Sequence, residues 1–366
     1  MSQNQEPLVS VVTPVYNGAE YLRECIESVI AQTYQNWCYT IVNNCSTDGS
    51  LEIAQHYARL DQRIRVRTNE TFLPIIENHS HAVSLVEPES AYCKPVMADD
   101  WIFPECIEKM VNCAVAHPSI GLVCSYTLAG KGILFDGLGC TGAAPTFVDG
   151  RSICRMSLLE DVYVFGSPTT MLIRSDLIRK RHPFYNSRNL HADEESAYDV
   201  LQESDFGFVH QVLSFFRMHQ QSQTSRVLEF DSIFVGRVYA LVKYGRVYLT
   251  EEEFERRCGE RFEQYYSMLA VAALRLRGAD FWKYHREKLA LIGAPLDRAR
   301  LLRSVALRAA KSCAAPMSAV RSARTWWPAA IRAQYRARKS LTSAPSGQRS
   351  IRVNLSKESG NEGGPP

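Results

Sequence analysis

Polar and acidic side chains gather in three short segments of the N-terminal half of the chain. The segments are Thr13–Gly18, Asn43–Ser50 and Ala98–Pro104, and the last contains the adjacent carboxylates of Asp99 and Asp100. In an open parallel sheet, ligands bind beyond the carboxyl ends of the strands. If the three segments follow such strands, they mark the place where a polar ligand binds.

Two further groups of ionisable residues invite a functional interpretation that we do not favour. His79 and His81 are two residues apart on an expected helix, a spacing that does not suit shared ligation of a metal ion, so we interpret them as incidental. Glu194 and Glu195 follow Asp193 directly, and adjacent residues on a helix point in different directions. We interpret the two glutamates as the solvated, acidic start of a helix.

The elements that would position the three polar segments alternate between strands and helices. Apolar runs predict strands at Leu8–Pro14, Trp37–Val42, Ile64–Arg67 and Tyr92–Met97. Helical spacing of apolar residues predicts helices at Ala19–Gln32, Leu51–Leu60 and Ile75–Val86, with Asp48 or Ser50 as the N-cap of the second. This alternation predicts an α/β fold with a mostly parallel central sheet.

Composition excludes several classes of protein. The chain has 366 residues, and its 42 basic and 39 acidic side chains leave a net charge of +3, so the overall charge does not favour nucleic acid as a partner. Its eleven cysteines are scattered without a Cys-x-x-Cys pair, which favours small buried side chains over disulfides or a zinc site. With no secretory leader and no apolar run long enough to span a membrane, we expect a cytoplasmic protein.

The C-terminal part has a different character from the sheet-forming part. Residues 226–295 are expected to form a helical extension, with Thr250 and Glu253 as a capping box. Residues 296–339 form a basic amphipathic segment, since Arg298–Lys339 holds eleven Lys or Arg and no Asp or Glu. This segment is interpreted either as an interfacial helix on the anionic inner face of the plasma membrane or as a tail packed on the sheet-forming domain. Residues 340–366 are expected to be disordered.

Several strings of the sequence resemble the family 2 glycosyltransferases of GT-A fold. They are VSVVTPVYNGAEYLRECIESVIAQTY, NNCSTDGS and ADDWIFPE, which occur in this order and at successive expected strand ends. The resemblance covers about residues 7–225. We therefore predict that residues 1–225 form the catalytic domain. It implies an inverting enzyme that transfers a sugar from a nucleotide-sugar donor to a saccharide or lipid-linked acceptor, with a divalent cation, Mg²⁺ or Mn²⁺.

The resemblance assigns donor-binding roles to the first two segments. Thr13, Pro14 and Tyr16 are expected to bind the nucleoside, although Pro14 could also serve only to make a turn. The second segment carries Asn43 and Asn44 where the family usually has two aspartates. Asn44 is expected to accept a hydrogen bond from the base, and a UDP-sugar is the first choice of donor, with thymine and guanine kept open.

The third segment corresponds to the family's metal loop, but its first aspartate is replaced by Met97. A thioether is a poor ligand for a hard cation, whereas one or two carboxylates together with phosphate oxygens of the substrate can suffice. Asp99 is therefore the principal expected ligand, which would also contact the nucleotide sugar, and Asp100 is a further candidate.

Two downstream strings complete the expected site. HADEESAYDVLQESDFGFV places Asp193 at the family's general base, and VLSFFRMHQQSQTS places His219 where it would reach the diphosphate or metal. GSPTTMLIR, residues Gly166–Arg174, resembles the segment near the acceptor.

A competing interpretation is a nucleotide-sugar-binding or scaffold protein that kept this fold and lost the chemistry, because Met97, Asn43 and Asn44 depart from the pattern. The presence of Asp99, Asp193 and His219 together favours the enzyme, with bacterial cell-surface polysaccharide or glycolipid assembly as its setting.

Overall fold

The computed structural model describes residues 6–129, 132–134, 138, 146–160, 162–219, 227 and 229–314. Its strands are β1 (Val9–Val15), β2 (Trp37–Asn43), β3 (Ile64–Thr68), β4 (Tyr92–Pro95), β5 (Trp101–Ile102), β6 (Ile120–Ala129), β7 (Gly132–Leu134), β8 (Phe147–Val148), β9 (Leu172–Arg174) and β10 (Asp205–Phe216). Its longer helices are α1 (Leu22–Ile30), α2 (Ser50–Leu60), α3 (Ile75–Ser84), α4 (Cys106–Ala116), α5 (Gly150–Glu160), α7 (Ala192–Val200), α9 (Ser232–Tyr248), α10 (Glu251–Leu274), α11 (Ala279–Leu291) and α12 (Arg298–Ala314). The strands and helices expected in the N-terminal half are all present, with ends that shift by a few residues.

The strands form one sheet in the order β3-β2-β1-β4-β9-β6-β10-β5. The pairs β3–β2, β2–β1, β1–β4 and β6–β10 are parallel, whereas β9 and β5 run antiparallel to their neighbours. The predicted mostly parallel α/β sheet is therefore confirmed. The carboxyl ends of β1, β2 and β4 lie at one edge, where the three polar segments follow them.

Both faces of the sheet are covered. All seven residues of β1 are buried, and the neighbours Val11 and Val12 belong to apolar clusters on opposite sides. The Val11 side includes residues of α1, α2 and α4, and the Val12 side includes residues of α3, α5 and α7. A strand buried on both faces explains why β1 reads as a continuous apolar run.

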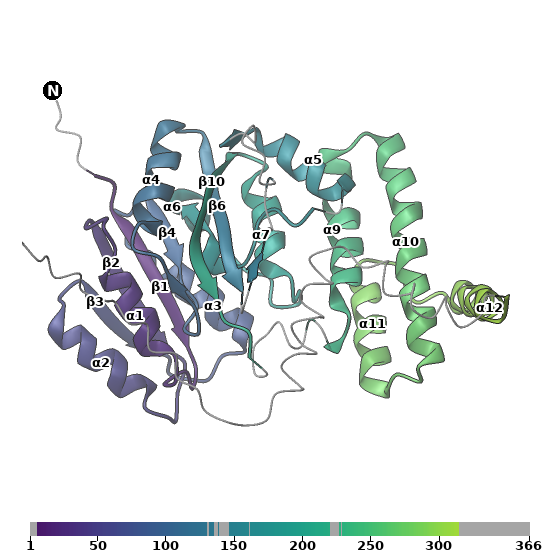
Figure 1. The fold of residues 1–366 in the computed structure, drawn as a ribbon, viewed down its shortest axis with the longest axis horizontal. Helices are drawn as coiled ribbons and strands as arrows, with labels where there is room; N and C mark the ends of the chain where they lie inside the picture. The colour runs from purple at the N-terminus through teal and green to yellow at the C-terminus, as the bar shows by residue number, and fades with distance from the viewer. Residues whose placement is uncertain are drawn as a thin grey trace, which may run out of the picture.

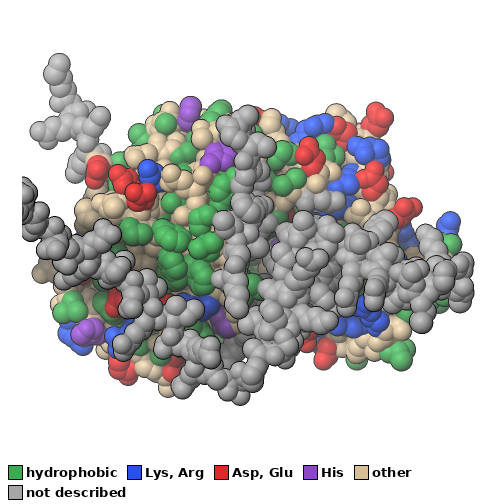
Figure 2. Space-filling view, in the orientation of Figure 1, with side chains coloured by type: hydrophobic (Ala, Val, Ile, Leu, Met, Phe, Trp, Pro, Cys, Tyr) green, Lys and Arg blue, Asp and Glu red, His purple; other side chains and the backbone are tan. Residues whose placement is uncertain are grey.

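Helices α9 to α12 form an extension at the end of the molecule away from β3 (Figure 1). The expected capping box of Thr250 and Glu253 starts α10. This extension has its own apolar cluster, which includes Val238, Leu269 and Phe281, and side chains of both charges are mixed over its visible face (Figure 2). Residues 315–339 of the basic segment and the tail 340–366 lie outside the described residues.

A buried carboxylate joins the extension to the sheet domain. Glu195 of α7 is 4% exposed, and its side chain accepts hydrogen bonds from Asn186, Asn189 and Tyr239. Lys243 of α9 completes the site with an ion pair of 2.6 Å. Glu195 is therefore not a solvated helix start, and that interpretation was wrong because the sequence does not show that α9 packs over α7.

We expect Glu195→Ala to lower the free energy of unfolding by about 2 kcal/mol, because it leaves several partly buried donors, among them Asn186, Asn189 and Tyr239, without their acceptor. Glu287→Ala, on the exposed face of α11, is the matched control and should change it by less than about 0.5 kcal/mol. Urea unfolding of both variants measures the difference. Equal stabilities would show that the junction does not depend on this carboxylate.

Candidate active site

A cavity of about 660 Å³ opens at the carboxyl ends of the parallel strands and continues toward the helical extension. Its volume lies within the range typical of small-molecule sites. Residues from all three polar segments line it, including Tyr16, Asn44 and Asp99, and so do Asp193 and His219 from the downstream strings. The structure thus brings together most of the residues singled out by the sequence.

Side-chain hydrogen bonds connect the first two segments. Asn17, whose φ is 49°, accepts the Thr47 amide at 2.8 Å through its side-chain oxygen. Asp48 accepts the Ala19 amide at 3.0 Å and the Ser50 amide at 3.0 Å. The N-cap of α2 is Gly49, so neither Asp48 nor Ser50 is the N-cap that we predicted. Asp48 instead precedes the cap, accepts the amide of the first helical residue and fixes the first segment against the second.

Thr13 does not reach the cavity. Its side chain is fully buried, donates a hydrogen bond to the Val96 carbonyl at 2.8 Å and pairs with the Tyr39 hydroxyl at 2.8 Å. Pro14, the next residue of β1, lines the cavity because successive residues of a strand face opposite sides. Thr13 thus holds the strand end in place, whereas Pro14 faces the ligand space.

An aromatic pair stands at the outer end of the cavity. Tyr16 is 49% exposed, and its ring lies edge-on to that of Phe72 with centroids 4.8 Å apart. Asn44 lies nearby, but its side-chain amide already forms hydrogen bonds within the protein. Its oxygen accepts the Leu73 and Asn69 N–H groups, and its nitrogen donates to the Leu73 carbonyl. Asn44 therefore holds the loop that presents Phe72.

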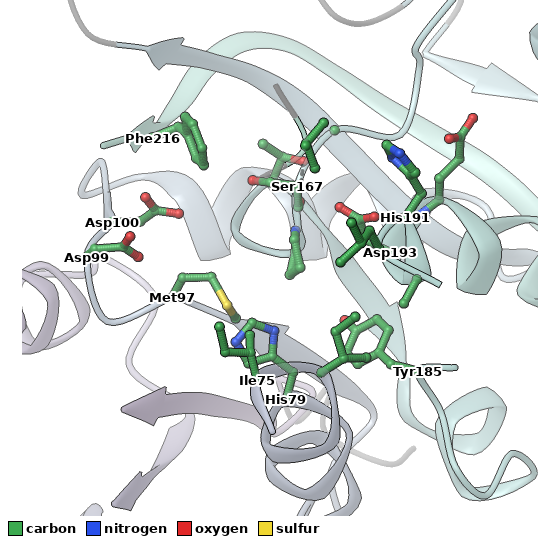
Figure 3. A pocket seen from close by; sticks show the side chains of 18 of the residues that line it. Ile75, His79, Met97, Asp99, Asp100, Ser167, Tyr185, His191, Asp193 and Phe216 are labelled. Atoms are coloured by element: carbon green, nitrogen blue, oxygen red, sulfur yellow. Dashed lines mark hydrogen bonds between the residues drawn. The ribbon is translucent and has the colours of Figure 1, made fainter. Parts of the chain in front are cut away.

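The third segment brings an imidazole against a carboxylate. His219 Nε2 lies 2.9 Å from Asp99 Oδ2, and both side chains line the cavity. Met97 lies on the same wall, beside His79 and Ile75 (Figure 3). The predicted pair Asp99 and His219 is thus assembled from β4 and β10, 120 residues apart.

Asp100 plays a different part from Asp99. It is 1% exposed, and its two oxygens accept hydrogen bonds from the Thr169 hydroxyl at 2.5 Å and the Arg217 amide at 3.0 Å. Burial, aided by the charge of Asp99, raises the pKa of Asp100 to about 8. The fully buried Lys94 braces the same region by donating to the carbonyls of Thr169 and Met171. Asp100 lines the cavity, but its two oxygens are already held by Thr169 and Arg217, so it is fixed as part of the loop.

The donor set suits a cation that also binds the substrate. Asp99 and His219 offer one oxygen and one nitrogen on the cavity wall, and the described residues contain no group of three or more His, Cys, Asp or Glu that could hold a metal ion. Mg²⁺ and Mn²⁺ sites commonly take their remaining ligands from substrate phosphates and water. The residues present thus fit a cation that arrives with a diphosphate.

Asp193 faces this pair from the opposite side of the cavity (Figure 3). It lies in the first turn of α7, and its Oδ1 accepts the Glu194 amide at 2.9 Å. Burial raises the pKa of Asp193 to about 6, although hydrogen bonds from backbone amides and from Tyr163 act in the opposite direction. A carboxylate with this pKa can accept a proton near neutral pH.

Several lining residues were not expected from the sequence. His79 lines the cavity, and burial lowers its pKa to about 4, so the ring is neutral at physiological pH; His81 does not line the cavity. Glu194 also lines it, which corrects its interpretation as a solvated residue. Arg237 and Arg261 come from α9 and α10, and no local pattern in the sequence marks them.

The segment expected near the acceptor does contribute. Gly166 and Ser167 line the cavity, and Gly166 has a φ of 72°. A Cβ at Gly166 would lie 2.2 Å from the Thr170 hydroxyl oxygen, so the close approach of backbone there requires glycine.

The chain is similar to known glycosyltransferases. Its residues 10–180 match the family described as Glycosyl transferase family 2. The Bacillus subtilis protein TuaG, by name a teichuronic acid biosynthesis glycosyltransferase, is 46% identical over 63 residues, which are 17% of this chain and 25% of TuaG. The chain spans about half or less of the length of the curated relatives it matches first.

Solved structures with low sequence identity share the fold. Residues 1–349 of Staphylococcus aureus TarS, in complex with UDP-GlcNAc, are 15% identical, with a TM-score of 0.59 over 81% of this chain and 89% of that fragment. The mannosyltransferase PcManGT of Pyrobaculum calidifontis, in complex with GDP-Man and Mn²⁺, is 15% identical, with a TM-score of 0.52 over 92% of this chain and 88% of PcManGT. The fold is GT-A, and residues 10–180 of the chain are similar to the family 2 glycosyltransferases.

Proposed function

We propose that this protein transfers a sugar from a nucleoside-diphosphate sugar to an acceptor hydroxyl, with inversion at the anomeric carbon. The observation that carries the proposal is the placement of Asp193 across one cavity from Asp99 and His219. An in-line displacement needs the leaving diphosphate and the base on opposite sides of the sugar. In this cavity, Asp99 and His219 would lie on the diphosphate side and Asp193 on the side of the base.

Asp193 acts as the general base in this proposal. Its carboxylate takes the proton of the acceptor hydroxyl while that oxygen forms a bond to the anomeric carbon. The bond from the anomeric carbon to the diphosphate breaks at the same time, and the electron pair leaves with the nucleoside diphosphate. Because burial raises its pKa to about 6, Asp193 is a stronger base than an exposed aspartate and is still ionised at neutral pH.

The outer end of the cavity binds the nucleoside. Tyr16 and Phe72 provide aromatic surface for the base, with Pro14 beside them. A UDP-sugar remains the first choice of donor, which the similarity to a UDP-GlcNAc complex supports, and the GDP-Man complex keeps guanine open. Asn44 lines the cavity and contributes by fixing the Phe72 loop.

Asp99 and His219 would hold a divalent cation, Mg²⁺ or Mn²⁺, together with the diphosphate. A bound cation neutralises the charge that develops on the leaving group. The Mn²⁺ complex of PcManGT supports this assignment. Arg217 fixes the loop from behind, since its side chain donates to the Asp99 carbonyl at 3.0 Å.

The acceptor is proposed to be a saccharide or lipid-linked saccharide of bacterial cell-surface polymer assembly, a setting supported by the name of TuaG. The described residues form no helix long and apolar enough to span a bilayer. We propose instead a cytoplasmic protein whose helix α12 lies on the inner face of the plasma membrane. Helix α12 packs against α10, yet its Leu302 and Leu307 are 69% and 55% exposed, beside the exposed Arg303.

We expect Asp193→Asn to lower transfer turnover by about 10²- to 10⁴-fold while UDP affinity changes little, because the base acts on the acceptor and not on the diphosphate. Transfer and hydrolysis are measured with a panel of nucleotide sugars. Asp280→Asn, an exposed first-turn aspartate of α11, should keep wild-type turnover.

The pH profile gives an independent test of the same assignment. Turnover of the wild type should rise as the pH increases through about 6, where Asp193 loses its proton, and then level off. The rise should be missing from the residual activity of Asp193→Asn. A variant with more than about a third of wild-type turnover would exclude Asp193 as the base. A protein that binds UDP-sugars but turns none over would be the scaffold alternative.

We expect Asp99→Ala to weaken both Mn²⁺ activation and UDP binding, whereas Met97→Asp should lower the Mn²⁺ concentration needed for half-maximal activity, since it adds the carboxylate missing from the loop. Asp280→Ala controls for the loss of one negative charge. An unchanged Mn²⁺ requirement in Met97→Asp would show that position 97 does not face the ion.

We expect the full chain to sediment with anionic vesicles but not with neutral ones, and less so at high salt, because each basic side chain near an anionic surface contributes about 1 kcal/mol. Truncation at Pro295 should abolish binding, and Leu302→Asp with Leu307→Asp should reduce it. Leu276→Asp, at an 89% exposed position after α10, is the control. Equal recovery in the supernatant with both lipids would exclude membrane attachment.

A further inference from the structure

The space for the transferred sugar lies between the proposed cation site and the proposed base. Asp99 and Asp193 stand on opposite sides of the cavity, and three residues lie between them along one wall, namely Ile75, His79 and Met97 (Figure 3). In the proposed reaction, the sugar must reach from the diphosphate on one side to the acceptor hydroxyl on the other. This sugar wall, formed by Ile75, His79 and Met97, therefore faces the sugar.

The backbone holds the sugar wall in a fixed position. Ile75 and His79 are four residues apart on α3, so their side chains lie on the same face of that helix. The Met97 amide donates a hydrogen bond to the Thr169 hydroxyl at 3.1 Å, and the Met97 carbonyl accepts the Asp100 amide at 2.9 Å. Because these contacts exist without a ligand, the wall does not have to be ordered when the sugar binds.

The sugar wall combines apolar surface with one uncharged polar group. Ile75 is 42% exposed, and the thioether of Met97 lies beside the ring of His79 (Figure 3). Within the part of the chain that the structure describes, no residue forms a hydrogen bond or an ion pair with this ring. Burial lowers the pKa of His79 to about 4, although the charge of Asp99 acts in the opposite direction. At neutral pH the ring therefore offers one N–H donor and one nitrogen acceptor to a ligand.

Building on the proposed function, we propose that the transferred sugar is an N-acetylhexosamine and that the sugar wall binds its acetamido group. An acetamido group carries an apolar methyl next to an amide with one donor and one acceptor. Ile75 and Met97 pack against the methyl, and His79 forms a hydrogen bond with the amide. A hydroxyl in this place would leave the two apolar side chains without an apolar partner. A carboxylate would meet no cation, since none of the three side chains is charged at neutral pH.

The wild-type full chain provides the first test. Titration calorimetry with Mn²⁺ present compares UDP-N-acetylglucosamine with UDP-glucose, and UDP-N-acetylgalactosamine with UDP-galactose, so that each pair differs only in the acetamido group. We expect the acetamido donor of at least one pair to bind roughly fivefold or more tightly than its hydroxyl partner. A smaller preference in both pairs, or tighter binding of the hydroxyl donors, overturns the proposal. Failure of UDP itself to bind would instead contradict the proposed function, so the two failures are distinguishable.

The second test asks whether His79 causes this preference. His79→Leu should reduce the preference to roughly twofold or less with UDP affinity unchanged, whereas His79→Gln, which keeps a donor and an acceptor, should retain most of it. His81→Leu, the same change on α3 at a position that does not line the cavity, is the matched control. A preference in His79→Leu as strong as in the control overturns the proposal. If His79→Leu does not fold, Ile75→Asn at its exposed position decides in the same way, because it removes apolar contact with the methyl.

Discussion

The candidate active site depends on the buried carboxylate of Glu195. This side chain binds Lys243 and Tyr239 of α9 together with Asn186 and Asn189 of the preceding loop, so α7 cannot move without the extension. The Tyr244 hydroxyl adds a hydrogen bond of 3.3 Å to the Glu195 carbonyl. Because Asp193 lies two residues earlier on the same helix, the position of the base is set by contacts made outside the sheet domain.

The proposed donor side of the cavity is instead held in place by contacts within the sheet domain. There the strand ends carry the binding residues, and short-range hydrogen bonds from Asn17 and Asp48 hold adjacent segments together. Lys94, Thr169 and Asp100 brace the third segment from the interior of the sheet. The loop that carries Met97 is therefore kept in shape by buried polar contacts, and its form does not require the missing carboxylate.

The sequence predicted those features that depend on neighbouring residues along the chain. The strands, the first helices and the meeting of three polar segments follow from apolar periodicity and parallel-sheet topology, and the family resemblance pointed to Asp99, Asp193 and His219. Strand alternation decides that Pro14 lines the cavity while Thr13 does not, and the prediction for the first segment left this alternation out. The roles of Glu194 and Glu195 could not be predicted, because they depend on which face of α7 is covered by helices that follow in the chain.

Those later helices line the same cavity as Asp193 and are therefore not a separate appendage. An aspartate at the start of a helix would ordinarily be solvated and have a pKa near 4. Here, burial beneath protein that includes the extension raises the pKa of Asp193 to about 6. The same packing lets Arg237 and Arg261 line the cavity next to the base. The sheet domain provides the proposed donor site, whereas α9 and α10 complete the walls of the cavity around Asp193, so the position of the proposed base depends on helices that the sheet domain does not contain.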